Sequence, residues 1–165
     1  MSSKSELPIT LDIVRSKNLE QLKVLNSVIF PIKYQDKTYQ ECMDSGAVTQ
    51  FALHTDVVVG GIAAQLQPQA EGGSKLYIMS LGVLAPYRNS GVGSKLLRHS
   101  LKVAEKDPSV REAYLHVQAS NTEAQAFYKK FGFELKESVP DYYKKLAEPD
   151  AVILSKVLKA AAVSA

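Results

Sequence analysis

The sequence predicts a single α/β domain, and three observations support this prediction. A short apolar run at 75–84 is followed by a turn with two glycines and then by a segment, 94–105, whose apolar residues recur at helical spacing. Two further runs, 49–54 and 57–66, are typical of a β-hairpin. The chain of 165 residues, 45% hydrophobic and 22% charged, is long enough to bury one core.

Local signals place the other elements. Asn18 is a residue type that caps helices, and Pro31 ends the helix that Asn18 would begin. Residues 55–56 are expected to form the hairpin turn, while the glycines at 60–61 mark a bulge or a close approach of another backbone. The domain is expected to span 1–165, with a core at about 9–158 and short flexible ends. Strands are expected at 9–14, 49–54, 57–66, 75–84, 113–118, 133–139 and 151–157, and helices after Asn18, at 36–43, at 94–105 and after Asn121.

Composition limits the classes of partner and the compartment. The formal net charge of +3 is too small to indicate a nucleic-acid partner. The one cysteine, Cys42, excludes an internal disulfide and is expected to be structural or incidental. No apolar run approaches the roughly 20 residues needed to cross a bilayer, and no signal peptide opens the chain. We therefore expect a cytosolic protein without a metal or a membrane partner, with the nucleus as a second location.

The segment 88–93, Arg-Asn-Ser-Gly-Val-Gly, joins the predicted strand at 75–84 to the predicted helix at 94–105. Glycine lets the backbone approach an anion closely, and the first N–H groups of a helix lack intrahelical partners. With the positive end of the helix dipole, these groups favour a pyrophosphate. The spacing fits neither the Rossmann fingerprint nor a Walker loop. An ordinary strand-to-helix turn would explain the same residues, so both interpretations stay open at this point.

Two motifs resemble those of the GCN5-related N-acetyltransferase superfamily. Arg-x-x-Gly-x-Gly at 88–93, entered through Val-Leu-Ala-Pro-Tyr at 83–87, is similar to the acetyl-CoA loop of that superfamily. The segment 119–133 has an Asn at the head of a helix that ends in Phe-Tyr-x-x-x-Gly-Phe, which resembles the closing signature. The resemblance implies a single mixed, mostly antiparallel sheet flanked by helices, with acetyl-CoA as co-substrate.

The same resemblance implies which residues bind acetyl-CoA. The backbone amides at 81–83 would pair with the pantetheine arm and polarise the acetyl carbonyl. Tyr128 would hydrogen-bond or protonate the departing thiolate, or would only pack against the pantetheine. Asn121 would hold polar groups of the ligands, although a helix cap would explain its type equally well. The full set is Leu81, Gly82, Val83, Arg88, Asn89, Ser90, Gly91, Val92, Gly93, Ser94, Asn121 and Tyr128.

Four further segments, 28–34, 76–82, 114–118 and 141–144, resemble the members of the superfamily that acetylate protein N-termini. This resemblance implies acetyl transfer to the α-amine of nascent or free peptides that begin with Met followed by a hydrophobic residue. It also implies binding to the catalytic and ribosome-anchoring subunits of the N-terminal acetyltransferase A complex.

Tyr77 and His116 are the catalytic candidates under this resemblance. An α-amine has a pKa of about 7.7–8.0, so a base is useful at pH 7. His116, with an ordinary pKa of about 6.5, is suited to take the proton directly or through a water. Tyr77, with an ordinary pKa of about 10, would need a strong perturbation to act as a base and would otherwise orient that water. Which of the two is the formal base stays open.

The peptide is expected to contact two loop segments and one strand. Apolar Phe30 and Ile32 suit a methionine side chain, and tyrosine hydroxyls can hold the peptide backbone. Lys33 and Ala147 depart from the family pattern, which leaves the second-residue preference less defined than the reaction. The full set of candidate substrate-binding residues is Phe30, Pro31, Ile32, Tyr34, Met79, Tyr142 and Tyr143.

Two alternatives remain. An acetyltransferase of the same fold could act on a lysine side chain or a polyamine, but a polyamine site should show clustered carboxylates, and 30–34 and 141–144 supply few. A regulatory acetyl-CoA-binding subunit of the N-terminal acetyltransferase A complex should show a degraded site, whereas Tyr77, His116 and Arg88 are all present.

Overall fold

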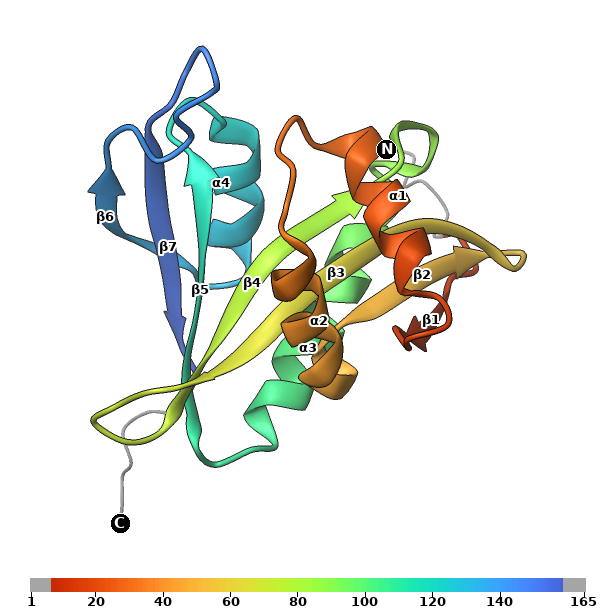
Figure 1. Ribbon diagram of the computed structural model, residues 1–165, viewed down its shortest axis with the longest axis horizontal. Helices are drawn as coiled ribbons and strands as arrows, with labels where there is room; N and C mark the ends of the chain where they lie inside the picture. Colours follow the sequence, from red (N-terminus) through yellow and green to blue (C-terminus); the bar gives the residue numbers. More distant parts are fainter. Residues whose placement is uncertain (1–6, 159–165) are drawn as a thin grey trace, which may run out of the picture. The chain divides into compact units, whose positions relative to one another are not determined.

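The computed structural model describes residues 7–158, so the flexible tail predicted at 159–165 and residues 1–6 lie outside the described part. The strands are β1 Thr10–Ile13, β2 Gln50–His54, β3 Val57–Pro68, β4 Ser74–Val83, β5 Val110–Gln118, β6 Glu134–Val139 and β7 Ala151–Val157 (Figure 1). The α-helices are α1 Leu19–Ile29, α2 Asp36–Asp44, α3 Val92–Glu105 and α4 Thr122–Lys130, and short 3-10 turns occupy Gly46–Val48 and Ala85–Tyr87.

The strands form one mixed sheet in the order β1-β2-β3-β4-β5-β7-β6. β4 and β5 run parallel, while β1 with β2, β2 with β3, β5 with β7 and β6 with β7 run antiparallel. This confirms the predicted class, a single mixed and mostly antiparallel sheet with helices. The described residues fall into two compact units, 7–66 with 78–107 and 67–77 with 108–158.

In the first unit, α1 and α3 approach opposite faces of β3. A methyl group added at Gly61 would lie 3.1 Å from Leu22 Cδ1 and 3.2 Å from Leu25 Cδ2, both in α1. One added at the adjacent Gly60 would lie 3.3 Å from Val92 Cγ1 in α3. Consecutive residues of a strand point to opposite faces, so the two glycines let one helix pack closely on each face.

The β2–β3 hairpin matches the prediction. Thr55 and Asp56 have φ angles of 47° and 67°, the left-handed region that a tight two-residue hairpin turn requires. The pairing register shifts beside Gly60, whose partner is Ala52, as it does at a β-bulge. A methyl group on Gly60 would also lie 2.9 Å from the Gly82 carbonyl oxygen. Both expectations for this glycine pair, the bulge and the close backbone approach, are therefore confirmed.

Two helix starts differ from the prediction. Asn18 occupies the N-cap position of α1, but its side chain makes no cap hydrogen bond. Its Oδ1 instead accepts a hydrogen bond from the Arg15 backbone N–H at 2.6 Å, which closes the turn before the helix. α3 begins at Val92, two residues before the predicted start at 94, because the left-handed Gly91 ends the preceding turn directly before it.

In the second unit, β5 begins at Val110, three residues before the predicted start, because its ladder with β4 extends back to a pairing of Ser74 with Val110. Side chains on β5 alternate between buried residues, such as Leu115 and Val117, and half-buried ones, such as His116. α4 lies beside β5 (Figure 1), and the Gln125 side-chain amide donates a hydrogen bond to the Ala119 carbonyl at 2.9 Å.

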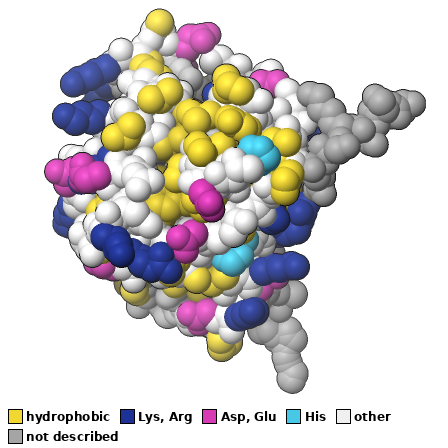
Figure 2. Space-filling model, turned by 90° about the vertical axis from the view of Figure 1, so that its right-hand side faces the viewer, with side chains coloured by type: hydrophobic (Ala, Val, Ile, Leu, Met, Phe, Trp, Pro, Cys, Tyr) yellow, Lys and Arg dark blue, Asp and Glu magenta, His cyan; other side chains and the backbone are white. Residues whose placement is uncertain are grey.

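The surface carries charges of both signs. On the face drawn in Figure 2, Lys and Arg side chains are interspersed with Asp and Glu instead of forming one continuous patch. Exposed large hydrophobic residues on the first unit include Val24, Val28 and Val57. Within residues 7–158, no helix has both the length and the apolar character needed to span a membrane.

Candidate active site

Tyr77 and His116 form a close pair in the second unit. β4 and β5 are parallel neighbours, and their register places Tyr77 opposite Tyr114. Because residues two apart on a strand share a face, His116 follows Tyr114 on the same face of β5. Tyr77 Oη lies 3.3 Å from His116 Nδ1, and the ring centroids are 5.8 Å apart. The structure therefore brings together the two residues that the sequence proposes as catalytic.

Two more aromatic rings flank this pair. The Tyr114 ring lies 4.9 Å from the Tyr77 ring, and the Tyr114 hydroxyl donates to Gln67 Oε1 at 2.5 Å. The Tyr142 ring stacks flat on the His116 imidazole, with centroids 4.0 Å apart and planes 4° from parallel. Tyr142 comes from the loop between β6 and β7 and not from a strand. The sequence places Tyr114 on the face of His116 but assigns it no role.

Burial governs the ionisation of this group. It lowers the pKa of His116 below its ordinary value, although the negative charge of Glu137 on β6 opposes the shift. The imidazole is therefore neutral at pH 7 and able to accept a proton. Burial also raises the pKa of Tyr114, and it raises the pKa of Tyr143 to about 12, so both phenols keep their protons and remain hydrogen-bond donors.

The predicted phosphate-binding loop begins α3 in the first unit. Gly91 is the N-cap residue, with a φ angle of 84°, and Asn89 is also left-handed, at 63°. Glycine has no side chain that could cap the helix, so no side-chain cap covers the first turn at 92–94. Arg88 Nε donates to the Val83 carbonyl at 2.9 Å, which holds this cation at the end of β4. The loop therefore has the uncapped amides and the fixed positive charge that a phosphate requires.

Phe30 packs against β4 at Gly82, a residue that the sequence predicts to bind the cofactor. A methyl group on Gly82 would lie 3.0 Å from both Cε2 and Cζ of Phe30, and 2.9 Å from Ile29 Cδ1. Only glycine at this position leaves room for the Phe30 ring in its present place. Phe30, a predicted substrate-binding residue, is therefore in contact with β4, the strand predicted to hold the pantetheine arm.

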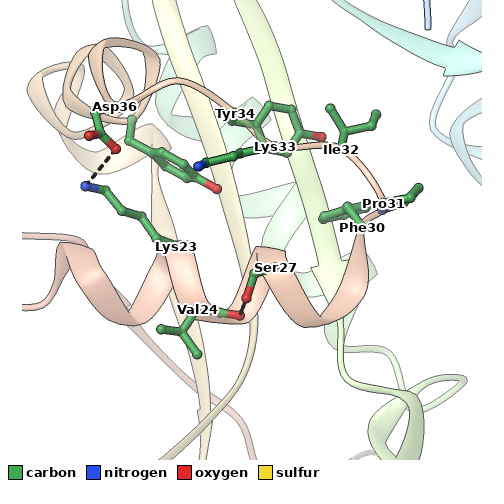
Figure 3. Close-up of a pocket in the computed structure, with 10 residues that line it drawn as sticks. Lys23, Val24, Ser27, Phe30, Pro31, Ile32, Lys33, Tyr34 and Asp36 are labelled. Carbon is green, nitrogen blue, oxygen red and sulfur yellow. Dashed lines mark hydrogen bonds and ion pairs between the residues drawn. The ribbon is translucent and has the colours of Figure 1, made fainter. Parts of the chain in front are cut away.

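A pocket of about 410 Å³ lies between α1, the loop that follows it and the start of α2 (Figure 3). The Lys23 ammonium and the Asp36 carboxylate pair at 3.2 Å at one end, and the Tyr34 ring meets the Phe30 ring edge-on at 6.3 Å. Four predicted substrate-binding residues line it, together with six that the sequence did not assign. The lining residues are Lys23, Val24, Ser27, Phe30, Pro31, Ile32, Lys33, Tyr34, Asp36 and Tyr39.

A buried polar group supports one wall of this pocket. Asn26 is 1% exposed, and its Nδ2 donates to Tyr39 Oη at 3.2 Å and to Ser80 Oγ at 3.0 Å. It thereby ties α1 to α2 and β4. Met79, a predicted substrate-binding residue, precedes Ser80 on β4 and is buried. In the sequence, Asn26 is distinguished only by being a polar amide among the apolar residues on one face of the predicted helix.

Asn121 is the N-cap residue of α4 in the second unit, and Tyr128 lies in the last turn of the same helix. Asn121 Oδ1 accepts a hydrogen bond from the Ala124 N–H at 3.1 Å, so its interpretation as a helix cap is confirmed. Tyr128 is buried, with the rings of Phe127 and Phe133 5.1 and 5.6 Å away. The assignments of Asn121 and Tyr128 to ligand binding stay predictions. Across residues 7–158 there is no group of three or more His, Cys, Asp or Glu able to hold a metal ion.

Comparison with known proteins relates this arrangement to a family. Residues 17–133 match the Acetyltransferase (GNAT) family. The chain is 44% identical over 151 residues to N-alpha-acetyltransferase 50 of Danio rerio, covering 92% of this chain and 89% of that protein. It is 41% identical over 151 residues to the probable N-acetyltransferase san of Drosophila melanogaster, covering 92% of this chain and 82% of that protein.

A solved structure agrees with these relatives. Arabidopsis thaliana Naa50, in complex with the bisubstrate analogue CoA-Ac-MVNAL, is 47% identical and superposes with a TM-score of 0.85 over 90% of this chain and 97% of that chain. These matches confirm the resemblance to N-alpha-acetyltransferase 50, or San, within the superfamily that the two sequence motifs indicate. The chain belongs to the GNAT family of acetyltransferases.

Proposed function

We propose that this chain is an N-terminal acetyltransferase, the catalytic subunit of N-terminal acetyltransferase E. It transfers acetyl from acetyl-CoA to the α-amine of peptides that begin with Met followed by a hydrophobic residue. The observation that carries the proposal is the Tyr77–His116 pair, 3.3 Å apart on neighbouring strands, in a chain 44% identical to an N-alpha-acetyltransferase 50. Without a proton acceptor for the amine, the fold alone would support only an acetyl-CoA-binding role.

The pair supplies the proton acceptor that the reaction needs. An α-amine is mostly protonated at pH 7, and only its neutral form can attack a thioester. The Tyr77–His116 pair takes one proton from the amine, directly or through a water, because the half-buried His116 is neutral at that pH. The amine nitrogen then bonds to the acetyl carbon, and the carbon–sulfur bond breaks. The departing sulfur leaves as a thiolate and takes up the second proton, which the nitrogen loses as the amide forms. The Tyr128 hydroxyl is proposed to relay that proton or to hydrogen-bond to the sulfur.

In this proposal the first unit binds the pyrophosphate and the pantetheine arm of acetyl-CoA. The uncapped first turn of α3 and the guanidinium of Arg88 neutralise the pyrophosphate, while the backbone of 81–83 pairs with the pantetheine arm. Asn121 holds polar groups of the ligands in addition to capping α4. The bisubstrate analogue in the 47%-identical Arabidopsis structure contains CoA, which supports acetyl-CoA as the co-substrate.

The proposed peptide contacts come from the segment around Phe30 and Ile32, from Met79 and from the Tyr142–Tyr143 pair. The peptide part of that bisubstrate analogue begins Met-Val, a methionine followed by a hydrophobic residue, which supports the same preference here. The apolar side chains that line the loop between α1 and α2 suit a methionine side chain. In this proposal the hydroxyl groups of Tyr142 and Tyr143 hold the peptide backbone.

Partners and location follow from the same assignment. We propose that the chain binds the catalytic and ribosome-anchoring subunits of the N-terminal acetyltransferase A complex and works in the cytosol, with the nucleus as a second location. The net charge of +3 supports neither nucleic acid nor an anionic membrane as a partner.

Acetylation rates on three peptides test this proposal. One peptide begins Met-Leu, one begins Ser, and one has a blocked N-terminus and an internal lysine. Preference for the Met-Leu peptide, lost in His116→Ala, is the expected result. Equal or faster turnover of the blocked lysine peptide would replace the proposal with a lysine acetyltransferase. Tight acetyl-CoA binding without turnover of any peptide would leave a regulatory subunit.

A further inference from the structure

The stack of Tyr142 on His116 is the closest aromatic contact in the second unit. The two rings lie 4.0 Å apart and 4° from parallel, so Tyr142 covers one face of the imidazole. The rings of Tyr77 and Tyr114, which are on neighbouring strands, are instead 4.9 Å apart and tilted by 37°. The covering ring comes from the loop between β6 and β7, in which Tyr142 is 41% exposed.

This loop holds the Tyr142 ring through its own backbone. The Asp141 N–H donates to Asp150 Oδ1 at 3.0 Å, and the Tyr143 N–H donates to the Pro149 carbonyl at 2.8 Å. These two bonds flank Tyr142 in the sequence and tie its loop to the residues that enter β7. The Tyr143 ring meets the Tyr142 ring edge-on at 4.9 Å. Tyr142 is therefore fixed from both sides, and its contact with His116 is a feature of the folded loop.

The imidazole is held on its edge as well as on its face. Tyr77 on β4 approaches Nδ1 at 3.3 Å, and Tyr114 on β5 lies 6.4 Å away, ring to ring. On β7, the apolar Ile153 pairs with His116, and on β6 Glu137 is the charged group whose field reaches the ring. A protonated His116 would therefore have one negatively charged neighbour, Glu137, and would otherwise be surrounded mostly by aromatic rings.

Covering a face of the imidazole has two opposing effects. Excluding water disfavours the charged form, whereas the π-face of Tyr142 attracts a cation. Burial is the largest cause of the lowered pKa of His116, and the stacked Tyr142 ring covers one face of that imidazole, so we expect the loss of solvation to be the larger effect.

We propose that Tyr142 is a positioning residue for His116: its stacked ring excludes water from the imidazole, fixes the ring plane and keeps the ring neutral and ready to accept a proton. This role goes beyond its proposed contact with the peptide backbone, which requires the hydroxyl group. The stacking role requires only the ring. The inference deepens the proposed function, because it assigns a role towards the residue proposed as the proton acceptor.

The test is the pKa of His116 measured by NMR in the free protein, for the wild type, Tyr142→Phe and Tyr142→Leu. His116→Gln identifies the signal among the three histidines of the chain. We expect the wild type and Tyr142→Phe to titrate alike, below about 6.5, and Tyr142→Leu to titrate at about 6.5 or above. An unchanged pKa in Tyr142→Leu would overturn the proposal, and so would a lower one, because attraction by the π-face would then be the dominant effect.

The pH dependence of acetylation separates this inference from the proposed function. If His116 accepts the amine proton, the acid limb of kcat/KM moves to higher pH in Tyr142→Leu, in step with the NMR titration. If the titration moves and the acid limb does not, the stacking role of Tyr142 holds, and His116 is not the proton acceptor.

Discussion

At the scale of single residues, the proposed acetyl transfer depends on Tyr77 and His116 acting on one proton. Their side chains meet at 3.3 Å, so removing either should disable the same step. We expect His116→Ala to lower kcat/KM by about 100-fold, within the usual range for a general base. The double variant Tyr77→Phe/His116→Ala should lose little more than His116→Ala alone, because residues that act as a unit are not additive.

Steady-state kinetics on a Met-Leu peptide measure this coupling, with the melting temperature of each variant as the control for folding. If the two single losses multiply in the double variant, the residues act independently, and a shared proton is excluded.

At the scale of elements, the start of α3 is expected to determine acetyl-CoA affinity. Gly91 has a φ angle of 84°, at which a residue with a side chain would lower the free energy of unfolding by about 1–2 kcal/mol. Gly91→Ala should therefore displace the uncapped amides and raise the KM for acetyl-CoA several-fold, while kcat changes little, because the substitution leaves the proton acceptors intact.

Gly46→Ala is a matched control for this substitution. Gly46 is also left-handed, at 79°, lies in the same unit, and a methyl group added there would meet no atom within 4 Å. The two variants should lose similar stability, measured by urea denaturation, but only Gly91→Ala should change the KM. Equal effects on the KM would mean that the loop acts through stability alone.

Local chemistry explains which elements could be predicted from the sequence. The hairpin turn at 55–56 and the end of α1 before Pro31 are determined by residues next to each other in the chain. Asn18 is the N-cap residue of α1 as predicted, but its side chain does not cap the helix, because its Oδ1 accepts the Arg15 N–H instead. The sequence does not distinguish between such local alternatives.

The candidate site could be predicted only in part, for a different reason. The family motifs name Tyr77 and His116, but their contact depends on the pairing of β4 with β5, which is a long-range feature. The stack of Tyr142 on His116 depends on the path of a loop without regular structure. The pocket residues on α1 include Val24, which is on the exposed side of the helix, and they belong to no motif.

At the scale of the whole molecule, the rate at which a thiol reagent labels Cys42 measures how often the fold opens. Its side chain is fully buried, and burial raises the pKa of its thiol to about 12. Because the thiolate is the reactive form, a thiol reagent at pH 8 should label the native protein only through unfolding. We expect labelling to be complete within minutes in concentrated denaturant and very slow in buffer, as followed by mass spectrometry. Rapid labelling in buffer would contradict the burial of Cys42.

The position of the acetyl group in the product distinguishes transfer to a peptide α-amine from transfer to a lysine side chain. A single peptide that begins Met-Leu and contains one internal lysine offers both kinds of amine to the enzyme at equal concentration. After one round of acetylation, fragmentation by mass spectrometry identifies the modified nitrogen. We expect the acetyl group on the methionine α-amine, with the lysine unmodified. Acetyl on the lysine side chain, with a free N-terminus, would contradict it.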